Sequence, residues 1–347
     1  MKTMKIKSPL TDRNEVKPLC EAGADELFCG IEPYGWRKRY KDFCINQRST
    51  GSNFTKLADL EKAISIAHKY GTKVHVAMNA FFYLEEQYEK VMGIIKDVLG
   101  IGADGIIFAD PVLLLKIDNS MLKSKDVIIG TDAVIFNSSS VKFYKRLGAT
   151  RVVLPRSMTI AEIKEVVKPD ISMEYEVFIF NDLCYFEDGL CTYCKEDTGG
   201  VKKEGRKKGK AYFFSASRIS RRGYSGGCRS RFRRQRIFLR NKPQQGPSVP
   251  FTYWTKKHIE GCGICAIYDL KMMGIGNMKV LDRNLPAEEK VKVTLFIKGA
   301  LDLLRGSDLS KADYIEKCKV LFKKTFKVKC DQYDCYYPSV FLENGGL

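Results

Sequence analysis

Six of the twelve cysteines in this 347-residue sequence form two groups that could hold a metal ion or cluster. In chain order they are Cys184, Cys191, Cys194, Cys228, Cys262 and Cys265. Cys191-Thr-Tyr-Cys194 and Cys262-Gly-Ile-Cys265 have the CxxC spacing that lets two thiolates point at one ion. Four thiolates could bind zinc or an iron–sulfur cluster, and the spacing does not choose between them.

The sequence also favours a cellular setting in which such thiols stay reduced. Residues 1–9 are rich in lysine and lack the apolar core of a secretory leader. No apolar run approaches the ~18 to 20 residues that a membrane span requires. We therefore expect a cytoplasmic protein, in which clustered cysteines bind metal or carry out redox chemistry more often than they form disulfides.

A second set of candidate residues directly follows short apolar runs that we interpret as strands. These candidate catalytic residues are Asn79, Asp110, Thr131, Arg156, Asp282 and Arg283. Arg156 or Arg283 could pair with a carboxylated co-substrate through charge-assisted hydrogen bonds. Asp110 also has a simpler interpretation, because Asp before Pro111 is typical of a helix N-cap with proline at the first helical position.

The formal charge of +18 is concentrated in one stretch of the chain. Residues 202–242 contain sixteen Lys and Arg and one acidic residue, Glu204, and so carry +15 of the total. Aromatic residues such as Phe213 and Tyr224 are interleaved with these cations, a mixture typical of binding to single-stranded or looped RNA. A solvated insertion, an anionic membrane or an acidic protein partner would also suit the charge. We favour RNA because Cys228 lies inside the stretch.

A repeated pattern predicts the elements that must position these residues. In five places a helical stretch ends at a glycine and a short apolar run follows; the glycines are Gly23, Gly71, Gly102, Gly148 and Gly274. Glycine is favoured there because it adopts the left-handed conformation without steric cost. Three further apolar runs, at 4–7, 127–131 and 174–180, bring the predicted strands to eight.

Stretches with helical periodicity separate these strands, at 57–70, 85–99, 141–147 and 160–167. Eight such units within about 280 residues favour a (β/α)8 barrel over an open doubly wound sheet. The candidate residues would then gather in the loops at one end of the barrel.

Three regions follow from this interpretation. The barrel would comprise residues 1–183 and 264–305. A cysteine-rich basic insertion at its mouth would comprise 184–263, between the last two strands. A C-terminal helix with a tail containing Tyr and Cys would complete the chain at 306–347.

The motifs, taken together, resemble the peptidase U32 family, the so-called collagenase-like proteases. The segments that carry the likeness are AGADELFCG, Asn53-Phe54, AHKYGTKVHVAMN, GADGIIFADP, GTD at 130–132, RLGATRVVLPR, EVFIFNDLCYFEDGLC, GGCRSRFRR and CAIYDLKMMGIGNMKVLDR. They run from residue 4 to residue 283 and match in order, spacing and strand context.

The resemblance implies a TIM-like barrel that holds a 4Fe-4S cluster. Zinc stays the alternative metal that the cysteine spacing allows. The family's four ligands fall on Cys184, Cys191, Cys228 and Cys265. Relatives hydroxylate RNA bases or ubiquinone precursors without oxygen, and prephenate is the oxygen donor implied for several. The resemblance therefore implies an iron–sulfur enzyme that modifies RNA. Four cysteines are left over and could form a second four-thiolate site, although thiols in a tail often bind no metal. They are Cys194, Cys262, Cys330 and Cys335.

Two departures from the family pattern lie near the expected active site. The His-Gly before the first cluster cysteine is Phe180-Asn181 here, so a histidine that could relay a proton is absent. The KIEGR element reads Lys279-Val280-Leu281-Asp282-Arg283, which loses the glutamate and moves the carboxylate by one residue. The substrate or the reaction could therefore differ from that of known members.

Two other functions stay open. The family name implies a peptidase or peptide-modifying enzyme, although the sequence offers no nucleophile, base and orienting group together. The third hypothesis is a non-catalytic RNA-binding or partner subunit in which the cluster is structural. The sequence does not indicate an oligomeric state.

Overall fold

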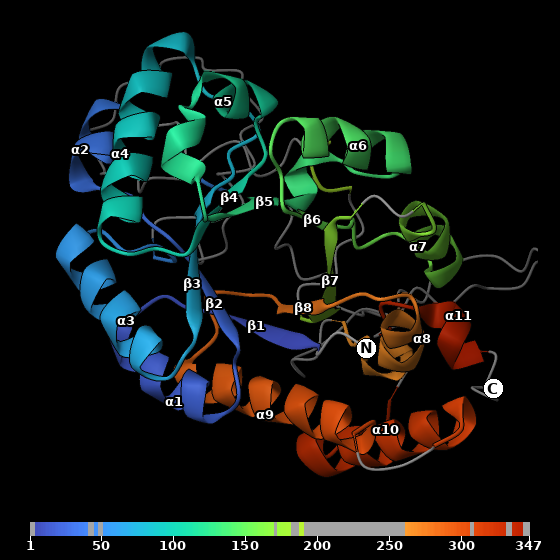
Figure 1. Cartoon of the computed structure of the whole chain (residues 1–347). Helices are drawn as coiled ribbons and strands as arrows, with labels where there is room; N and C mark the ends of the chain where they lie inside the picture. The colour runs from blue at the N-terminus through green and yellow to red at the C-terminus, as the bar shows by residue number, and fades with distance from the viewer. Residues whose placement is uncertain are drawn as a thin grey trace, which may run out of the picture.

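The computed structural model describes residues 4–40, 45–47, 51–169, 172–181, 187–190, 261–305, 309–330 and 335–342. Within them, parallel strands close into a barrel in the order β1 to β8, because β8 pairs with both β7 and β1 (Figure 1). The strands are β1 Lys5–Pro9, β2 Glu26–Gly30, β3 Lys73–Met78, β4 Gly105–Phe108, β5 Asp126–Ile129, β6 Arg151–Val153, β7 Glu174–Phe180 and β8 Asn277–Val280. The predicted (β/α)8 barrel is confirmed, and the open sheet is wrong.

Helices surround the barrel on its outside (Figure 1). They are α1 Val16–Glu21, α2 Tyr34–Arg39, α3 Leu57–Lys69, α4 Tyr88–Gly100, α5 Pro111–Lys116, α6 Ser138–Arg146, α7 Ile160–Val167, α8 Ile267–Met272, α9 Ala287–Leu303, α10 Lys311–Phe326 and α11 Pro338–Leu342. The helix predicted at 160–167 coincides with α7. After the barrel closes, α10 packs along α9, and α11 lies beside the segment that leads into α8.

The glycine pattern that predicted the strands reflects real helix ends. Five glycines follow α1, α3, α4, α6 and α8 with φ between 70° and 100°, and these are Gly23, Gly71, Gly102, Gly148 and Gly274. A side chain with a Cβ would be strained in this conformation. Each glycine therefore ends its helix and turns the chain toward the next strand.

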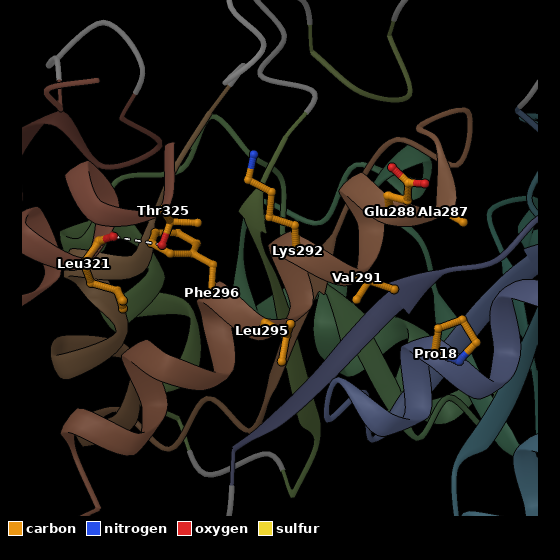
Figure 2. A pocket seen from close by; sticks show the side chains of 9 residues that line it. All are labelled: Pro18, Ala287, Glu288, Val291, Lys292, Leu295, Phe296, Leu321 and Thr325. Carbon is orange, nitrogen blue, oxygen red and sulfur yellow. Dashed lines mark hydrogen bonds between the residues drawn. The ribbon is translucent and has the colours of Figure 1, made fainter. Parts of the chain in front are cut away.

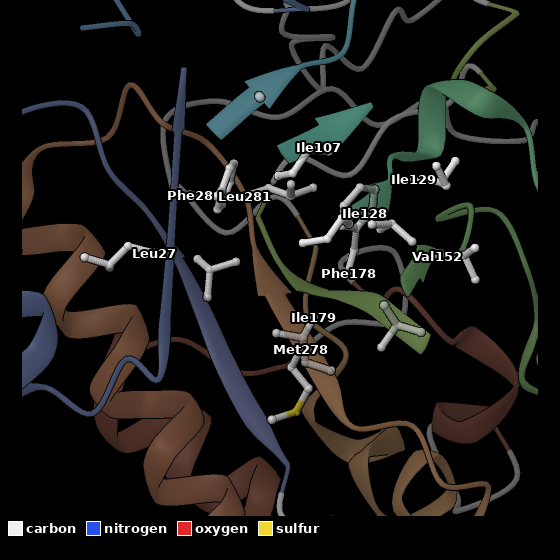
Figure 3. Packing of buried hydrophobic residues seen from close by; sticks show 14 of the residues in the cluster. Leu27, Phe28, Ile107, Ile128, Ile129, Val152, Phe178, Ile179, Met278 and Leu281 are labelled. Atoms are coloured by element: carbon white, nitrogen blue, oxygen red, sulfur yellow. The ribbon is translucent and has the colours of Figure 1, made fainter. Parts of the chain in front are cut away.

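Apolar side chains fill the layer between the barrel and the helices. Leu27, Ile129, Val152 and Met278 come from four different strands and are almost completely buried (Figure 3). Successive strand residues point to opposite faces, so the residues between them point toward the barrel axis. Those inward positions include charged side chains, which distinguishes the inside of this barrel from the purely apolar filling of many others.

Ion pairs cross the inside of the barrel. Arg151 on β6 donates from Nη2 to Glu26 Oε1 on β2 at 2.9 Å, although the two strands are not neighbours. Lys7 on β1 lies 2.5 Å from Glu176 Oε2 on β7 and 3.3 Å from Glu26 Oε2. Arg151 also reaches Glu176, at 3.1 Å. His75 completes this network, with Nε2 2.9 Å from Asp126 Oδ2.

The network keeps its carboxyl groups ionised. Burial alone would raise the pKa of Glu176, but Lys7, Lys279 and Arg151 outweigh burial and lower the pKa to about 2. The pKa of Glu26 is lowered for the same reason, chiefly by Lys7 and Arg151 against the effect of burial. Removing one partner from such a network leaves an opposite charge buried without compensation, which costs about 3–5 kcal/mol.

We expect Arg151→Met to lower the free energy of unfolding by about 3–5 kcal/mol, because Glu26 then keeps Lys7, His75 and the partly exposed Lys5 but loses its closest partner. Urea denaturation followed by circular dichroism measures the change. The matched control is Arg305→Met, which removes an exposed pair with Asp302 and should shift stability by less than about 1 kcal/mol. Equal stabilities for the two variants would contradict the structural role given to the network.

Candidate active site at the carboxyl end of the barrel

Polar side chains converge where the strands end, a region that we call the barrel mouth. Asn79, directly after β3, donates from Nδ2 to Asp132 Oδ2 at 2.7 Å. Asp132 belongs to the turn after β5, so this bond passes over the end of β4, which lies between the two strands. The bond orients both polar groups, and both side chains are partly exposed. Asn79 is therefore at the mouth, as the sequence predicted.

Arg156, after β6, is held in a bidentate ion pair. Its Nε donates to Asp188 Oδ2 at 3.0 Å and its Nη2 to Asp188 Oδ1 at 2.8 Å. The guanidinium also lies 4.9 Å from the centre of the Phe178 ring. Asp188 lies within the segment EVFIFNDLCYFEDGLC but was not a predicted site residue, because it is 32 residues from Arg156 and meets it only through the fold. The pair anchors residues 187–190 to the mouth.

Arg283, after β8, is buried and engaged by three side-chain or backbone oxygens. Its Nη1 donates to Asn53 Oδ1 at 2.9 Å and to the Ser52 carbonyl at 3.3 Å, and its Nη2 donates to Asn46 Oδ1 at 3.1 Å. Gly30, at the end of β2, makes room for this contact, because a Cβ there would overlap Asn53 and Arg283. Arg283 therefore fastens Asn46, Ser52 and Asn53 to the end of the barrel.

The three remaining candidates lie at the same end in different settings. Asp110 caps α5, since Oδ1 accepts from Val112 N at 2.9 Å, and Oδ2 accepts from Tyr88 Oη at 2.8 Å. The predicted N-cap role is thus confirmed. Thr131 is buried at the start of the turn after β5. Asp282 follows β8, and its Oδ1 accepts from Asn284 N at 3.1 Å. Catalytic roles for these residues stay predictions.

Three backbone positions at the mouth are strained. Val134, Asn181 and Asp282 follow β5, β7 and β8 with φ values of 56°, 66° and 68°. A residue other than glycine held in this region costs about 1–3 kcal/mol, and such positions cluster at functional sites. Positive φ values also occur at Ser124 and Ser172, which precede β5 and β7, so strain is present at both ends of the barrel.

Lys279 on β8 faces the same region from inside the barrel and was not among the predicted site residues. Its Nζ lies 3.4 Å from Glu176 Oε1 and 4.5 Å from the centre of the Phe28 ring. Burial lowers its pKa to about 8, against the opposing effect of Glu176. The signal that could have found it is the recurrence of charged residues at alternate positions of buried strands, as in Glu174 and Glu176.

The predicted cluster ligands divide between two parts of the chain. Cys184, Cys191 and Cys228, together with Cys194 and the basic stretch 202–242, lie outside the described residues. Cys265 lies in the short turn Ile264–Ala266 before α8, and a hydrogen bond with Cys318 of α10 contributes most to raising its pKa.

The left-over thiols of the described chain gather near Cys265. Cys262 forms β-bridges with Phe180 and Cys335. Burial raises the pKa of Cys262, and the nearby thiols of Cys265, Cys330 and Cys335 raise it further. Within the described residues, no group of three or more His, Cys, Asp or Glu is arranged to hold a metal ion. A second four-thiolate site stays a prediction.

The chemistry of the predicted donor set fits an iron–sulfur cluster. Four thiolates are the usual ligands of a 4Fe-4S cluster. Asn181, which precedes Cys184 in sequence, donates from its backbone N to the Gly261 carbonyl at 2.9 Å, and so binds the segment of Cys265 to the end of β7. Gly261 belongs to the segment that leads into the turn of Cys265, and a ligand role for Cys265 stays a prediction. The same four thiolates would also suit zinc.

One groove formed by the described residues lies away from the mouth. Figure 2 shows this groove of about 560 Å³ between α1, α9 and α10, where Val291, Leu295 and Leu321 form part of its wall. None of the predicted site residues lines it. In the described part of the chain, no helix is both long enough and apolar enough to cross a membrane.

The closed barrel and its polar mouth define the class of (β/α)8 protein that carries its binding and catalytic groups on the loops after the strands. The model of peptidase family U32 matches residues 11–337, and the chain belongs to this family. The resemblance inferred from the motifs is confirmed.

Curated relatives include proteins named for RNA hydroxylation. The tRNA hydroxylation protein P1 of Bacillus subtilis is 29% identical over 59% of this chain and 45% of its own length. The 23S rRNA 5-hydroxycytidine C2501 synthase of Escherichia coli is 25% identical over 58% of this chain and 28% of its own length. The chain therefore spans less than half the length of these relatives.

Two further similarities cover more of the chain. An uncharacterized protease of Methanocaldococcus jannaschii is 24% identical over 91% of this chain and 70% of its own length. The solved structure of the U32 peptidase Mk0906 aligns with a TM-score of 0.45 at 12% identity, over 82% of this chain and 95% of that one.

Gly30→Ala should lower the free energy of unfolding by about 1–3 kcal/mol, because the new methyl group displaces Asn53 or Arg283. Urea denaturation measures the loss. Gly35→Ala, on α2 with open space around its Cβ position, is the control and should leave stability unchanged or slightly higher. A neutral Gly30→Ala would mean that Arg283 is not packed as described.

Proposed function

We propose that this protein is an iron–sulfur-dependent enzyme that modifies RNA by oxygen-independent hydroxylation. The observation that carries the proposal is the similarity of the chain to proteins named for tRNA and rRNA hydroxylation. The polar mouth supports it, since such barrels carry their chemistry on the loops after the strands. The basic, aromatic-rich stretch 202–242 would bind the RNA through phosphate neutralisation and base stacking.

Cys184, Cys191, Cys228 and Cys265 would hold the cluster, which supplies one-electron redox chemistry when bound. The residues of the mouth would position the substrates. The Asn79–Asp132 pair offers a fixed amide and a carboxylate, and Arg156 presents one face of its guanidinium to Phe178. A carboxylated oxygen donor such as prephenate would supply the oxygen atom of the new hydroxyl group.

A peptidase finds less support among the described residues. His75 is buried and interacts with Asp126 and Glu26, and His68 pairs with Asp104 on the outer surface. In the described chain, neither histidine hydrogen-bonds a hydroxyl or thiol group that it could activate as a nucleophile. We therefore favour hydroxylation over peptide cleavage.

We expect protein purified without oxygen to contain about four irons per chain and to absorb near ~400 nm. Cys265→Ser should lose most of this iron and absorbance, because a hydroxyl group is a poor substitute for a thiolate ligand. Cys20→Ser, on α1, is the control and should keep both. Stoichiometric zinc with no iron under these conditions would contradict the cluster.

Cells that lack the gene should lose a hydroxylated RNA nucleoside, measured as a mass change of one oxygen atom in digests of total tRNA and rRNA. The wild-type gene should restore the nucleoside. Arg156→Ala should not restore it, because the mouth then loses both its guanidinium and the anchor of Asp188. Arg305→Ala is the control, since Arg305 is exposed and forms an ion pair with Asp302, three residues earlier in the chain.

Two outcomes of that measurement would count against the proposal. An unchanged nucleoside profile in cells without the gene would overturn the RNA function. Full restoration by Arg156→Ala, together with loss of restoration when residues 202–242 are deleted, would instead favour a non-catalytic RNA-binding subunit.

A further inference from the structure

Among the buried members of the network inside the barrel, positive side chains outnumber negative ones. Three cations share two completely buried carboxylates; the five residues are Lys7, Arg151, Lys279, Glu26 and Glu176. Both carboxylates lie closer to Lys7 or Arg151, at 2.5 Å each, than to Lys279, whose contact with Glu176 is 3.4 Å. The surplus charge therefore rests mainly on Lys279.

Another nearby carboxylate does not remove this surplus. Glu174 lies 2.8 Å from Arg151, but 42% of its side chain is exposed to solvent. It is the first residue of β7, whereas the mouth lies at the other end of that strand. Glu174 therefore compensates Arg151 from the far end of the barrel, and Asp126, which is also partly exposed, pairs with His75 and Lys73. Lys279 pairs within the network with Glu176 alone, while Asp132 at the mouth also acts on its charge.

Lys279 is also the most exposed of the three cations of the network, close to the end of β8. Its side chain is 8% exposed, whereas those of Lys7 and Glu176 are fully enclosed. Its Nζ lies 4.5 Å from the centre of the Phe28 ring and 5.9 Å from that of Phe178, and both rings are slightly exposed as well. A cation between two aromatic rings offers charge and flat apolar surface to the same ligand.

The two arginines that the sequence suggested as partners of a carboxylated co-substrate already bind other groups of the protein. Arg156 forms its bidentate pair with Asp188, and Arg283 donates to Asn53, Ser52 and Asn46. Recognition of a further anion by either one would compete with these contacts. Lys279 has no such competing bidentate partner among the described residues.

We propose that Lys279 is the anion-binding residue of the barrel mouth, and that it binds the carboxylate of a small molecule whose ring or apolar body rests on Phe28 and Phe178. The assignment of this molecule as the co-substrate of RNA hydroxylation rests on the proposed function. The binding itself does not, because it follows from the charge and the rings alone.

The pH dependence of binding follows from the groups that face Lys279. These are Glu176 on β7, Lys7 on β1 and Asp132 after β5. Burial, which is only partly offset by Glu176, lowers the pKa of Lys279 to about 8, so the ammonium loses its proton as the pH rises through this value. Affinity for a carboxylate should therefore be high at pH 7 and fall by pH 9.5, while Glu176 stays ionised throughout.

Calorimetric titration of the full-length protein with benzoate tests the proposal. We expect Lys279→Met to weaken binding at pH 7 by tenfold or more, and Lys279→Arg, which keeps the charge, to restore part of the loss. Lys17→Met, on the outer face of α1 in an exposed pair with Glu21, is the control and should bind as the wild type does. Wild-type affinity should fall between pH 7 and pH 9.5.

Three results would overturn the proposal. The first is that the wild type does not bind benzoate at about 10 mM. The others are that Lys279→Met binds benzoate as well as the wild type does, or that the affinity of the wild type does not change with pH. The pH profile needs no variant, so it decides the matter even if Lys279→Met fails to fold. If benzoate binds as expected while cellular RNA nucleosides are unchanged, the anion site stands and only the RNA function falls.

Discussion

A charge buried inside a protein must meet an opposite charge, because solvation in water is lost. In this barrel that requirement acts across the axis, where Arg151 of β6 meets Glu26 of β2 and Lys7 of β1 meets Glu176 of β7. Each pair joins strands far apart in the sequence. A shift of one residue in any of these strands would turn its charge outward, so the pairs also specify the register.

The register in turn determines which residues emerge at the mouth. Because Glu176 points inward, so does Phe178 two residues later, and its ring supports both Arg156 and Lys279. The same holds on β8, where inward-pointing Lys279 is followed closely by the turn at Asp282 and by Arg283. The polar mouth and the ionic interior are thus consecutive parts of the same strands.

Much of this architecture could be predicted from the sequence, because its signals are local. A glycine such as Gly148 reports the end of one helix and the start of a buried strand within a few residues. The partners of the candidate residues could not be predicted in this way. Nothing in the local sequence marks Asp188 or Asn46 as a partner, and they meet Arg156 and Arg283 only because the barrel closes. Lys279 could not be predicted as a site residue, because a lysine within a strand usually points into solvent. In this barrel the side chain of Lys279 points toward the barrel axis instead.

The hydrogen bond between the backbone N of Asn181 and the carbonyl of Gly261 has a consequence for how such proteins vary. The connection between β7 and β8 leaves the barrel and returns to it at the same point. The entropy of closing a loop rises slowly with length, by about 0.6 kcal/mol for each doubling. Residues can therefore be gained or lost within this connection while the barrel keeps its shape. Substrate preference could diversify there at little cost to folding.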